Sequence, residues 1–257
     1  MHEKVKKHIL EYAAKNMRFD GRKLEEYRKI EVQRGVSSTA EGSAIVKIGE
    51  TEVMAGVKML IEKPYPDTPD QGSLMVGVEM LPMSNPAFES GPPSRDAIEL
   101  ARVVDRGVRE SKAVDFKSLM IEHGAKVWIV SIDVVTINDA GNLFDASALA
   151  TIAAIMDTKY PVYDGTAIDY RTKTDQKLPL NKIPVSVTVI KIGNNFFIDP
   201  TEEEASAIDA RLTVATTADG TICALQKGGD EELSIEEIEI MINLGIKKGA
   251  ELRGYLG

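Results

Sequence analysis

The stretch from Val127 to Asp157 constrains the fold more than any other part of the chain. An apolar run rich in β-branched residues, VWIVSIDVVTI, is followed by the turn NDAGNL and by the Ala- and Ile-rich run FDASALATIAAIMD. This order predicts a buried strand, a tight turn and a packed helix. Gly141 lets the backbone approach a ligand closely, and the amides of the following helix N-terminus form a weak anion-binding cradle. We therefore expect a functional site at this turn.

The formal net charge of −9 over 257 residues argues against a protein that coats nucleic acid nonspecifically. That mode of binding needs many phosphate contacts from a basic surface, so any nucleic-acid contact is expected to be local. The three histidines have no metal-ligand spacing, and we expect neither zinc nor histidine catalysis. The single cysteine, Cys223, has apolar neighbours, which favours a buried structural thiol in a reducing compartment. With no segment of transmembrane length and no signal-peptide pattern, we expect a cytoplasmic protein without membrane contact.

The first part of the chain is predicted to contain a helix, a group of strands and a second helix. Residues 3–16 form an amphipathic pattern whose apolar face carries Val5, Ile9, Tyr12 and Ala13. Strand patterns follow at 30–32, 42–49, 51–62 and 74–83. Ser94 is a suitable N-cap for a helix that runs to about residue 112. One side of this helix is expected to carry Ile98, Ala101, Asp105 and Val108.

The segment 161–182 is polar and lacks strong periodicity, and we interpret it as the connection between two halves. Beyond it, strand patterns at 184–193 and 195–199 are followed by a hairpin pattern over 211–229, and a Ser-Ile-Glu-Glu capping box opens a final helix. This order predicts an α+β fold made of two mixed βαβ-type halves with sheets covered by helices. The expected divisions are an N-terminal helical extension (1–20), a first half (21–160), the connection (161–182) and a second half (183–257).

Four arginines on the helix after Ser94 form one stripe, because Arg95, Arg102, Arg106 and Arg109 are seven, four and three residues apart. Such a row can track the phosphates of a single nucleic-acid strand, since each guanidinium donates two hydrogen bonds and keeps its charge. The alternative is a solvated helix face on which acidic neighbours pair with the arginines. Spacing alone favours this alternative.

Five carboxylates follow the strand pattern at 195–199, namely Asp199, Glu202, Glu203, Glu204 and Asp209. Converging carboxylates could hold a divalent cation for phosphoryl chemistry. A solvated acidic turn is the commoner explanation of such a run, and nothing near it in the sequence supplies the positive charge that a phosphoryl substrate needs. The turn at 138–143 has neither the lysine nor the spacing of a Walker loop, so by itself it predicts only a strand-to-helix turn.

Five separated motifs occur together in the order seen in the RNase PH family. They are MRFDGRKLEEYRKIEV, EGSAIVKIGETEVMAGVK, IELARVVDRGVRES, the strand-turn-helix at 127–157, and DPTEEEASAIDA followed by a DG hairpin. The chain resembles this family from Met17 to Leu252, and it is most similar to the non-catalytic RNase PH-like subunits of archaeal exosome rings. The helix before the DGR segment and the turn DAGNLFDA both resemble that branch. The resemblance implies an RNase PH-like fold.

In active members of the family, a small hydroxyl residue and an arginine at the central turn hold the attacking phosphate. The corresponding positions here are Asn142 and Leu143, and leucine neither pairs with phosphate nor donates a hydrogen bond to it. The family's two catalytic aspartates correspond to Glu203 and Asp209, so acids remain at both places. The resemblance therefore implies a vestigial phosphate site at Gly141 to Leu143, lost phosphorolysis, and no catalytic residue, metal or cofactor.

The resemblance also implies partners. In the family, such a subunit pairs with a catalytic RNase PH-like subunit, three heterodimers close a hexameric ring, single-stranded RNA threads the channel, and RNA-binding cap subunits sit on one face. The arginine stripe lies on the family's RNA-facing helix, which makes Arg102, Arg106 and Arg109 candidates for RNA contact. We expect a non-catalytic subunit of a 3′-to-5′ phosphorolytic exoribonuclease complex. Two alternatives remain, an active phosphate-dependent exoribonuclease that uses Glu203 and Asp209, and a scaffold without RNA contact.

Overall fold

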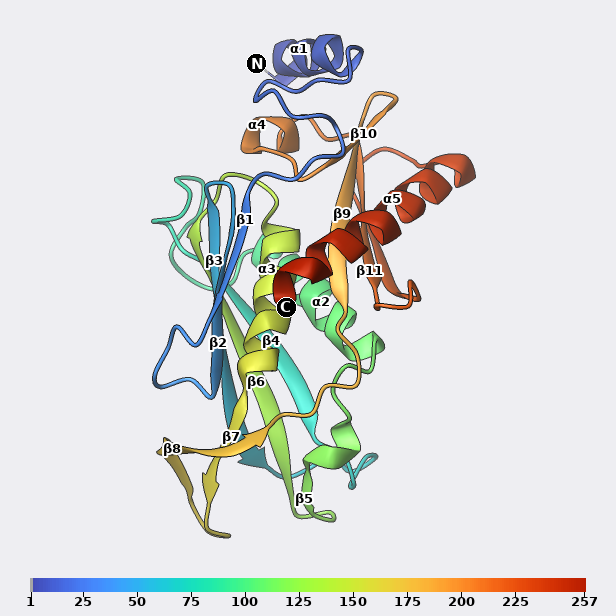
Figure 1. Cartoon of the computed structure of the whole chain (residues 1–257). Coiled ribbons are helices and arrows are strands. Elements are labelled where there is room, and N and C mark those ends of the chain that lie inside the picture. The colour runs from blue at the N-terminus through green and yellow to red at the C-terminus, as the bar shows by residue number, and fades with distance from the viewer. Residues whose placement is uncertain (1) are drawn as a thin grey trace.

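A computed structural model describes residues 2–257 of the chain (Figure 1). Met1, the first residue of the expected N-terminal extension, lies outside the described residues. The helices are α1 (His2–Ala13), α2 (Arg95–Glu110), α3 (Leu143–Asp157), α4 (Glu202–Ala205) and α5 (Ile235–Arg253), with 3₁₀ turns η1 (Phe116–Leu119) and η2 (Gly254–Leu256). The strands are β1 (Ile30–Arg34), β2 (Gly42–Ile48), β3 (Thr51–Glu62), β4 (Ser73–Met80), β5 (Met120–Glu122), β6 (Lys126–Asn138), β7 (Lys159–Tyr163), β8 (Ile168–Lys177), β9 (Val185–Ile192), β10 (Asn195–Ile198), β11 (Ala210–Thr216) and β12 (Ile222–Gly228).

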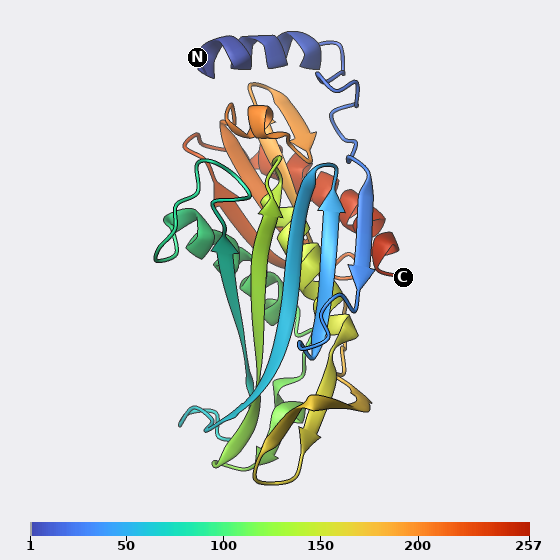
Figure 2. The same cartoon turned by 90° about the vertical axis from the view of Figure 1, so that its left-hand side faces the viewer.

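The first sheet has the strand order β1-β2-β3-β6-β4, with β5 beside β6. It is mixed, because β4 runs parallel to β6 while the other pairs are antiparallel. The expected hairpin is confirmed as β2 and β3, joined at Gly49 with φ +59°. Along β3 buried residues alternate with half-exposed ones, as expected of a sheet with one face on the core. Figure 2 shows the other face of this sheet.

The second sheet has the order β10-β9-β11-β12 and is antiparallel throughout. The α+β fold with helix-covered sheets is confirmed, but mixed pairing is confined to the first half. The physical reason is the length of the connections. Tight turns join β9 to β10 and β11 to β12, and short turns join only antiparallel strands.

Helix α3 lies between the two sheets, which confirms the strand-turn-helix expected for 127–157. It packs against β2 and β3 on one side and β9 on the other, with α2 beside it (Figure 1). Every residue from Asp145 to Ile155 is buried. A helix enclosed on all sides needs small and apolar residues around its whole circumference, which explains the run of Ala and Ile. Helix α5 covers the outer face of the second sheet.

The side of α2 expected to carry Ile98, Ala101, Asp105 and Val108 is not uniformly buried, because Ile98 is 51% exposed. Ser94 does cap the helix, accepting a hydrogen bond from the amide of Ala97. Because α2 contacts both β4 and the second sheet, its buried surface is broader than one stripe. The buried residues are Ala97, Leu100, Val103, Val104, Gly107 and Val108.

Most of the segment 161–182 belongs to a two-stranded antiparallel sheet formed by β7 and β8. Most residues of β8 are exposed on both faces, so the strand lacks the apolar alternation that would have marked it in the sequence. Edge-to-face contacts of Trp128 with Tyr160 and Tyr163 anchor this hairpin to the body.

Helix α1 confirms the expected N-terminal helix and crosses one end of the molecule (Figure 2). It docks on the second sheet through a small separate core that joins Ile9 and Ala13 to Ile190, Ile192 and Phe197. The face was expected to include Tyr12, but Tyr12 is 43% exposed and contacts Phe19 edge to face.

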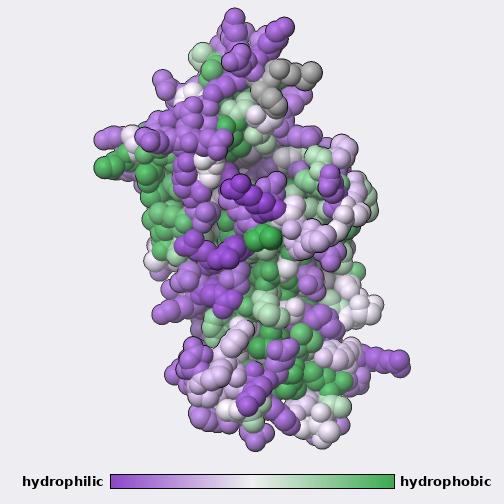
Figure 3. All heavy atoms as spheres, turned by 180° about the vertical axis from the view of Figure 1, so that it is seen from behind, coloured by the Kyte–Doolittle hydropathy of each residue, from purple (hydrophilic) through white to green (hydrophobic). Residues whose placement is uncertain are grey.

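The surface mixes hydrophilic and hydrophobic side chains, with the hydrophobic ones densest in the lower half of the rear view (Figure 3). Within residues 2–257, no helix combines the length and apolar character needed to cross a membrane. Cys223 is only half-buried, because the edge strand β12 carries it, so the expectation of a buried thiol is wrong. Partial burial raises the pKa of this thiol, which disfavours the thiolate.

Candidate functional site

The turn between β6 and α3 packs directly against the segment that leads into α4. Gly141 has φ +96°, and a Cβ at this position would lie 2.3 Å from the carbonyl oxygen of Pro200. Only glycine meets both conditions, a left-handed backbone and a contact without space for a side chain. The turn therefore joins the first half of the chain to the second.

Asn142 begins α3 in the left-handed conformation, with φ +62°. Its side chain does not cap the helix. Instead, Nδ2 donates to Asp145 Oδ2 at 3.2 Å and to Asp199 Oδ1 at 2.9 Å. The next residue, Leu143, packs against the main hydrophobic core. The negative groups bound to Asn142 at this end of α3 are thus the protein's own carboxylates.

Asp199 is fully buried and has φ +50°. Its carboxylate accepts hydrogen bonds from Nε and Nη2 of Arg28, at 2.8 and 2.7 Å, and from Nη1 of Arg22 at 2.9 Å. Burial pushes the pKa of Asp199 upward, but the hydrogen bonds and charge of Arg28, with the charge of Arg22, hold it below its ordinary value. Asp199 is therefore ionised at neutral pH.

Two arginines connect this carboxylate to its surroundings. Arg28 also donates to the carbonyl oxygens of Ala140 at 2.8 Å and Gly141 at 3.1 Å, so it holds the turn and Asp199 together. Arg18 is buried, pairs with Glu204 and donates to the carbonyl oxygen of Asp199 at 2.7 Å. These bonds link the segment before β1, the β6–α3 turn and the start of α4. We call this set of groups the junction.

Asp145 is a further buried carboxylate of the junction. It accepts hydrogen bonds from the amide of Thr188 at 2.7 Å and from the hydroxyl of Tyr27 at 2.9 Å, besides the one from Asn142. Burial raises its pKa to about 7 despite these donors. Burial and the neighbouring Asp145 also raise the pKa of Tyr27 well above its usual value, so Tyr27 remains a neutral donor.

The arginines of α2 differ in their surroundings. Arg95, Arg102 and Arg106 are exposed, and Nη1 of Arg106 donates to Gln226 Oε1 at 3.0 Å. Arg109 instead pairs with Asp105, at 2.9 Å from Nε and 2.8 Å from Nη2, and also donates to the carbonyl oxygen of Leu74. The solvated ion-pair alternative therefore describes Arg109, and it does not describe Arg106.

The comparisons with known proteins identify the fold. Residues 26–161 match domain 1 of the 3′ exoribonuclease family, RNase PH, and residues 182–248 match its domain 2. The chain belongs to the RNase PH family. The RNase PH-like fold implied by the sequence motifs is thereby confirmed.

Named relatives within the RNase PH family cover almost the whole chain. The chain is 48% identical over 244 residues to exosome complex component Rrp42 of Archaeoglobus fulgidus, covering 93% of this chain and 92% of that protein. It is 42% identical over 257 residues to exosome complex component Rrp42 of Methanothermobacter thermautotrophicus, covering 99% and 94%.

Solved structures give the same result. A structure described as the Archaeoglobus fulgidus exosome with RNA bound to the active site contains a chain with TM-score 0.93 and 44% identity, covering 100% of this chain and 99% of that one. A chain of an archaeal exosome core has TM-score 0.88 and 42% identity, covering 99% and 97%. Rice Rrp46, at 16% identity and TM-score 0.70, shares the fold alone.

The two residual acids of the RNase PH pattern lie in different surroundings. Glu203 is exposed on α4, whereas Asp209 is 8% exposed, forms an ion pair with Lys6 of α1 and accepts a hydrogen bond from the amide of Gly193 at 2.7 Å. In residues 2–257, no group of acidic, histidine or cysteine side chains is arranged to hold a metal ion. The five carboxylates therefore do not converge on one point, because Asp199, Glu204 and Asp209 each pair with a different cationic side chain of the chain.

Sequence reasoning missed the positive charge beside the acidic stretch. Arg18, Arg22 and Arg28 supply it, although they lie more than 170 residues away in the chain. Their only signal was the motif MRFDGRKLEEYRKIEV, which marks the family and does not reveal which carboxylates the arginines meet.

Proposed function

We propose that the chain is a non-catalytic subunit of an exosome, a 3′-to-5′ phosphorolytic RNA-degrading complex. Its Rrp42 relatives carry the name of an exosome component at 42–48% identity, and a chain from a structure of an archaeal exosome with RNA bound to the active site has the same fold. On this proposal the chain pairs with a catalytic RNase PH-like subunit and helps to structure that subunit's active site.

The observation that carries the non-catalytic role is the chemistry at the start of α3. Leu143 stands where active members hold phosphate with an arginine, and the amide of Asn142 is bonded to two buried carboxylates. Arg28 and Arg22 are already committed to Asp199. A phosphate would bring further negative charge beside these carboxylates without gaining a new cation. Phosphorolysis depends on positioning and neutralising that phosphate, so this chain has lost it.

The groove beside the turn supports the same conclusion. It has a volume of about 620 Å³ and its lining includes Asp20, Glu50, Glu202 and Glu203, with Arg28 as its cation. Such a predominantly acidic lining disfavours an inorganic phosphate or a phosphodiester, because like charges repel in a partly desolvated site.

The proposed assembly is a hexameric ring of three heterodimers with RNA-binding cap subunits on one face, working in the cytoplasm. Large exposed apolar side chains support a partner surface. Ile98 of α2, Met75 of β4 and Met83 in the following loop are 51%, 45% and 71% exposed, and α2 packs beside β4, an edge strand of the first sheet.

Co-expression with the catalytic subunit followed by native mass measurement is expected to give a 3:3 complex. A chain that stays monomeric beside its folded partner contradicts this assembly.

In the ring, Arg102 and Arg106 are proposed to contact single-stranded RNA, with Arg109 in a secondary role because Asp105 neutralises it. Replacing both Arg102 and Arg106 by glutamate is expected to weaken RNA binding by the complex and to lower the slope of log affinity against log salt, by about 0.7 for every phosphate that the variant no longer neutralises. Assembly should be unchanged, and native mass measurement of the variant complex checks this. Equal affinity at matched salt would favour a scaffold without RNA contact.

The second candidate is an active phosphate-dependent exoribonuclease, favoured only by the acids Glu203 and Asp209. The test is the activity of a complex that carries Glu203→Ala and Asp209→Ala, compared with a Lys6→Ala complex. Lys6→Ala breaks the same ion pair as Asp209→Ala but keeps both acids. Unchanged activity of the double variant rules this candidate out, and loss in the double variant alone supports it.

A further inference from the structure

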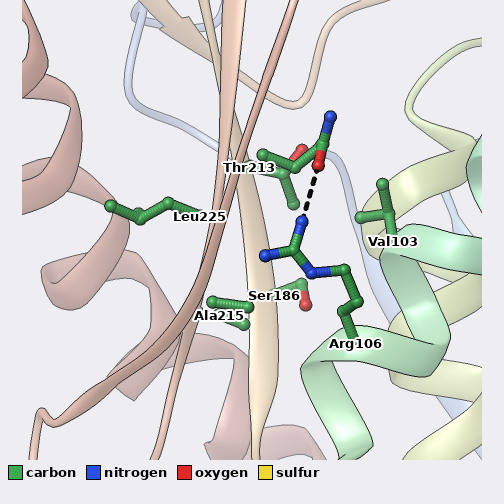
Figure 4. Close-up of a pocket in the computed structure, with 8 residues that line it drawn as sticks. Val103, Arg106, Ser186, Thr213, Ala215 and Leu225 are labelled. Carbon is green, nitrogen blue, oxygen red and sulfur yellow. Dashed lines mark hydrogen bonds between the residues drawn. The ribbon is translucent and has the colours of Figure 1, made fainter. Parts of the chain in front are cut away.

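Arg106 lies at the contact between α2 and the second sheet. Its side chain extends from the helix toward the strands, close to Val103, Ser186, Thr213 and Ala215 (Figure 4). The cavity that these residues line has a volume of about 10 Å³, which is space for one water molecule at most. The aliphatic part of Arg106 is therefore packed, and the guanidinium lies at the rim of the contact.

The group that meets this guanidinium is the side-chain amide of Gln226. Its Oε1 accepts from Arg106 Nη1 at 3.0 Å, the bond drawn as a dashed line in Figure 4. Its Nε2 donates to the carbonyl oxygen of Lys227 at 3.2 Å, which fixes the orientation of the amide. Gln226 is opposite Thr213 in the pairing of β11 with β12, so both project on the face toward α2, whereas Leu225 points to the other side of the sheet (Figure 4).

Two arginines near Arg106 have charged partners. Arg109 pairs with Asp105, and Arg211 of β11 pairs with Glu99 at 2.6 Å. Gln226 is neutral, so it restrains Arg106 without cancelling its charge. Within residues 2–257, Nε and Nη2 of Arg106 donate to no protein acceptor and remain available to a phosphate oxygen, and Arg102 on the adjacent turn is exposed.

We propose that Gln226 is a positioning residue for RNA, a neutral anchor that holds Arg106 oriented and fully charged for a phosphate of the single strand. This inference rests on the proposed RNA role of α2 and extends that surface to the edge strand β12. A long side chain loses rotamer freedom when it binds, and a side chain that is already restrained loses less. The neutrality of the anchor matters because an acidic anchor would pair with the guanidinium and compete with phosphate.

The test measures the affinity of the assembled complex for a single-stranded RNA over a series of salt concentrations. Gln226→Glu supplies a carboxylate to Arg106 and is expected to lower affinity about tenfold at low salt and to reduce the salt slope by about 0.7, as Arg106→Gln does. The double variant should lose no more than either single variant. Gln226→Ala keeps the charge and loses only the restraint, so it should cost about threefold with an unchanged salt slope.

The matched control is Gln176→Glu, which makes the same change of charge on the exposed strand β8. Native mass measurement of each variant complex verifies assembly. If Arg106→Gln has no effect, the proposed RNA role of Arg106 fails. The role of Gln226 is overturned, while that of Arg106 stands, if Arg106→Gln weakens binding but Gln226→Glu has no larger effect than Gln176→Glu. It is also overturned if the losses of Arg106→Gln and Gln226→Glu add in the double variant.

Discussion

Three residues at the junction have a left-handed backbone, namely Gly141, Asn142 and Asp199. For a residue with a side chain this conformation costs on the order of 1–2 kcal/mol, although Asn and Asp tolerate it best. The network of Arg28, Asn142 and Asp199 holds the strained residues in place. At the scale of single residues, the turn is therefore part of a clamp between the two halves.

Gly141→Ala tests this clamp, and Gly165→Ala is its matched control. Both glycines have similar positive φ, +96° and +94°, so the backbone strain of alanine is alike. A Cβ at position 165 meets nothing within 4 Å, whereas at position 141 it lies 2.3 Å from the carbonyl oxygen of Pro200. We expect Gly141→Ala to lower the free energy of unfolding by about 1–3 kcal/mol more than Gly165→Ala. Denaturant unfolding followed by fluorescence of Trp128 measures this, and equal losses would contradict the close packing.

Asp145 gives the junction a pH dependence whose sign is fixed by its raised pKa. The folded pKa is about 7 and the ordinary value is 3.8, so between these values the folded protein holds a proton that the unfolded chain has released. The stabilisation that comes from protonated Asp145 is therefore fully present below about pH 4. Between about pH 4 and pH 7 the free energy of unfolding falls, by at most about 1.4 kcal/mol per pH unit.

Asp145→Asn should remove this slope, because asparagine is neutral throughout. The measurement is the free energy of unfolding from pH 5 to pH 8 in both proteins. Asp164→Asn is the control, since hydrogen bonds from Ala167 and Thr166 lower the pKa of Asp164 and it does not titrate in this window. A slope that survives in Asp145→Asn would assign the pH dependence to another group.

At the scale of secondary-structure elements, the sequence predicts well what local chemistry controls. The β2–β3 hairpin, the Ser94 cap and the capping box of Ser234 and Glu237 follow from turn and cap residues and are confirmed. The full buried surface of α2 does not follow from its sequence, because two layers contact that helix and no local pattern records the second layer. The exposed hairpin of β7 and β8 has no apolar face to reveal it.

In the candidate site, too, the sequence predicts what local chemistry controls and misses what depends on tertiary contacts. Local sequence places Gly141, Asn142 and Leu143 at a strand-to-helix turn, and this holds in the structure. The pairing of Arg28 with Asp199 depends on tertiary contacts across 171 residues, which periodicity does not encode. Roles for Asn142, Leu143 and the α2 arginines in function remain predictions.

Helix α1 is an element held by few contacts. Its docking depends on Ile9, 3% exposed, on Ala13, and on the pair of Lys6 with Asp209. Ile9→Ala is expected to weaken docking by about 2 kcal/mol, which raises the population of undocked helix and its cleavage by trypsin about thirtyfold. Limited proteolysis with mass analysis of the released peptide measures this.

Lys4→Ala is the control for this change, because Lys4 is exposed and its replacement removes one cleavage site without disturbing the small core. The body, which has its own main core, should keep its unfolding transition in both variants. Equal cleavage of α1 in the parent chain and in Ile9→Ala would show that the small core does not hold the helix.

At the scale of the whole molecule, two sheets enclose α2 and α3, and the junction locks one end of that arrangement. Within residues 2–257, the arginines beside the turn, Arg22 and Arg28, are both bound to Asp199. Exposed arginines without a carboxylate partner in this range lie instead on α2, and Arg106 is beside the edge of the second sheet. We infer that the molecule contributes its shape and its arginines to a complex in which a partner performs the chemistry.

The most direct measurement is phosphorolysis by the purified chain, alone and in complex with its catalytic RNase PH-like partner. Each sample is incubated with a single-stranded RNA in phosphate buffer, and released nucleoside diphosphates are quantified. We expect the chain alone to release no nucleoside diphosphate at any phosphate concentration. We expect the complex to release nucleoside diphosphates in the 3′-to-5′ direction, and this activity should persist when the chain carries Glu203→Gln. Nucleoside diphosphates released by the chain alone, and abolished by Glu203→Gln, would contradict the non-catalytic role.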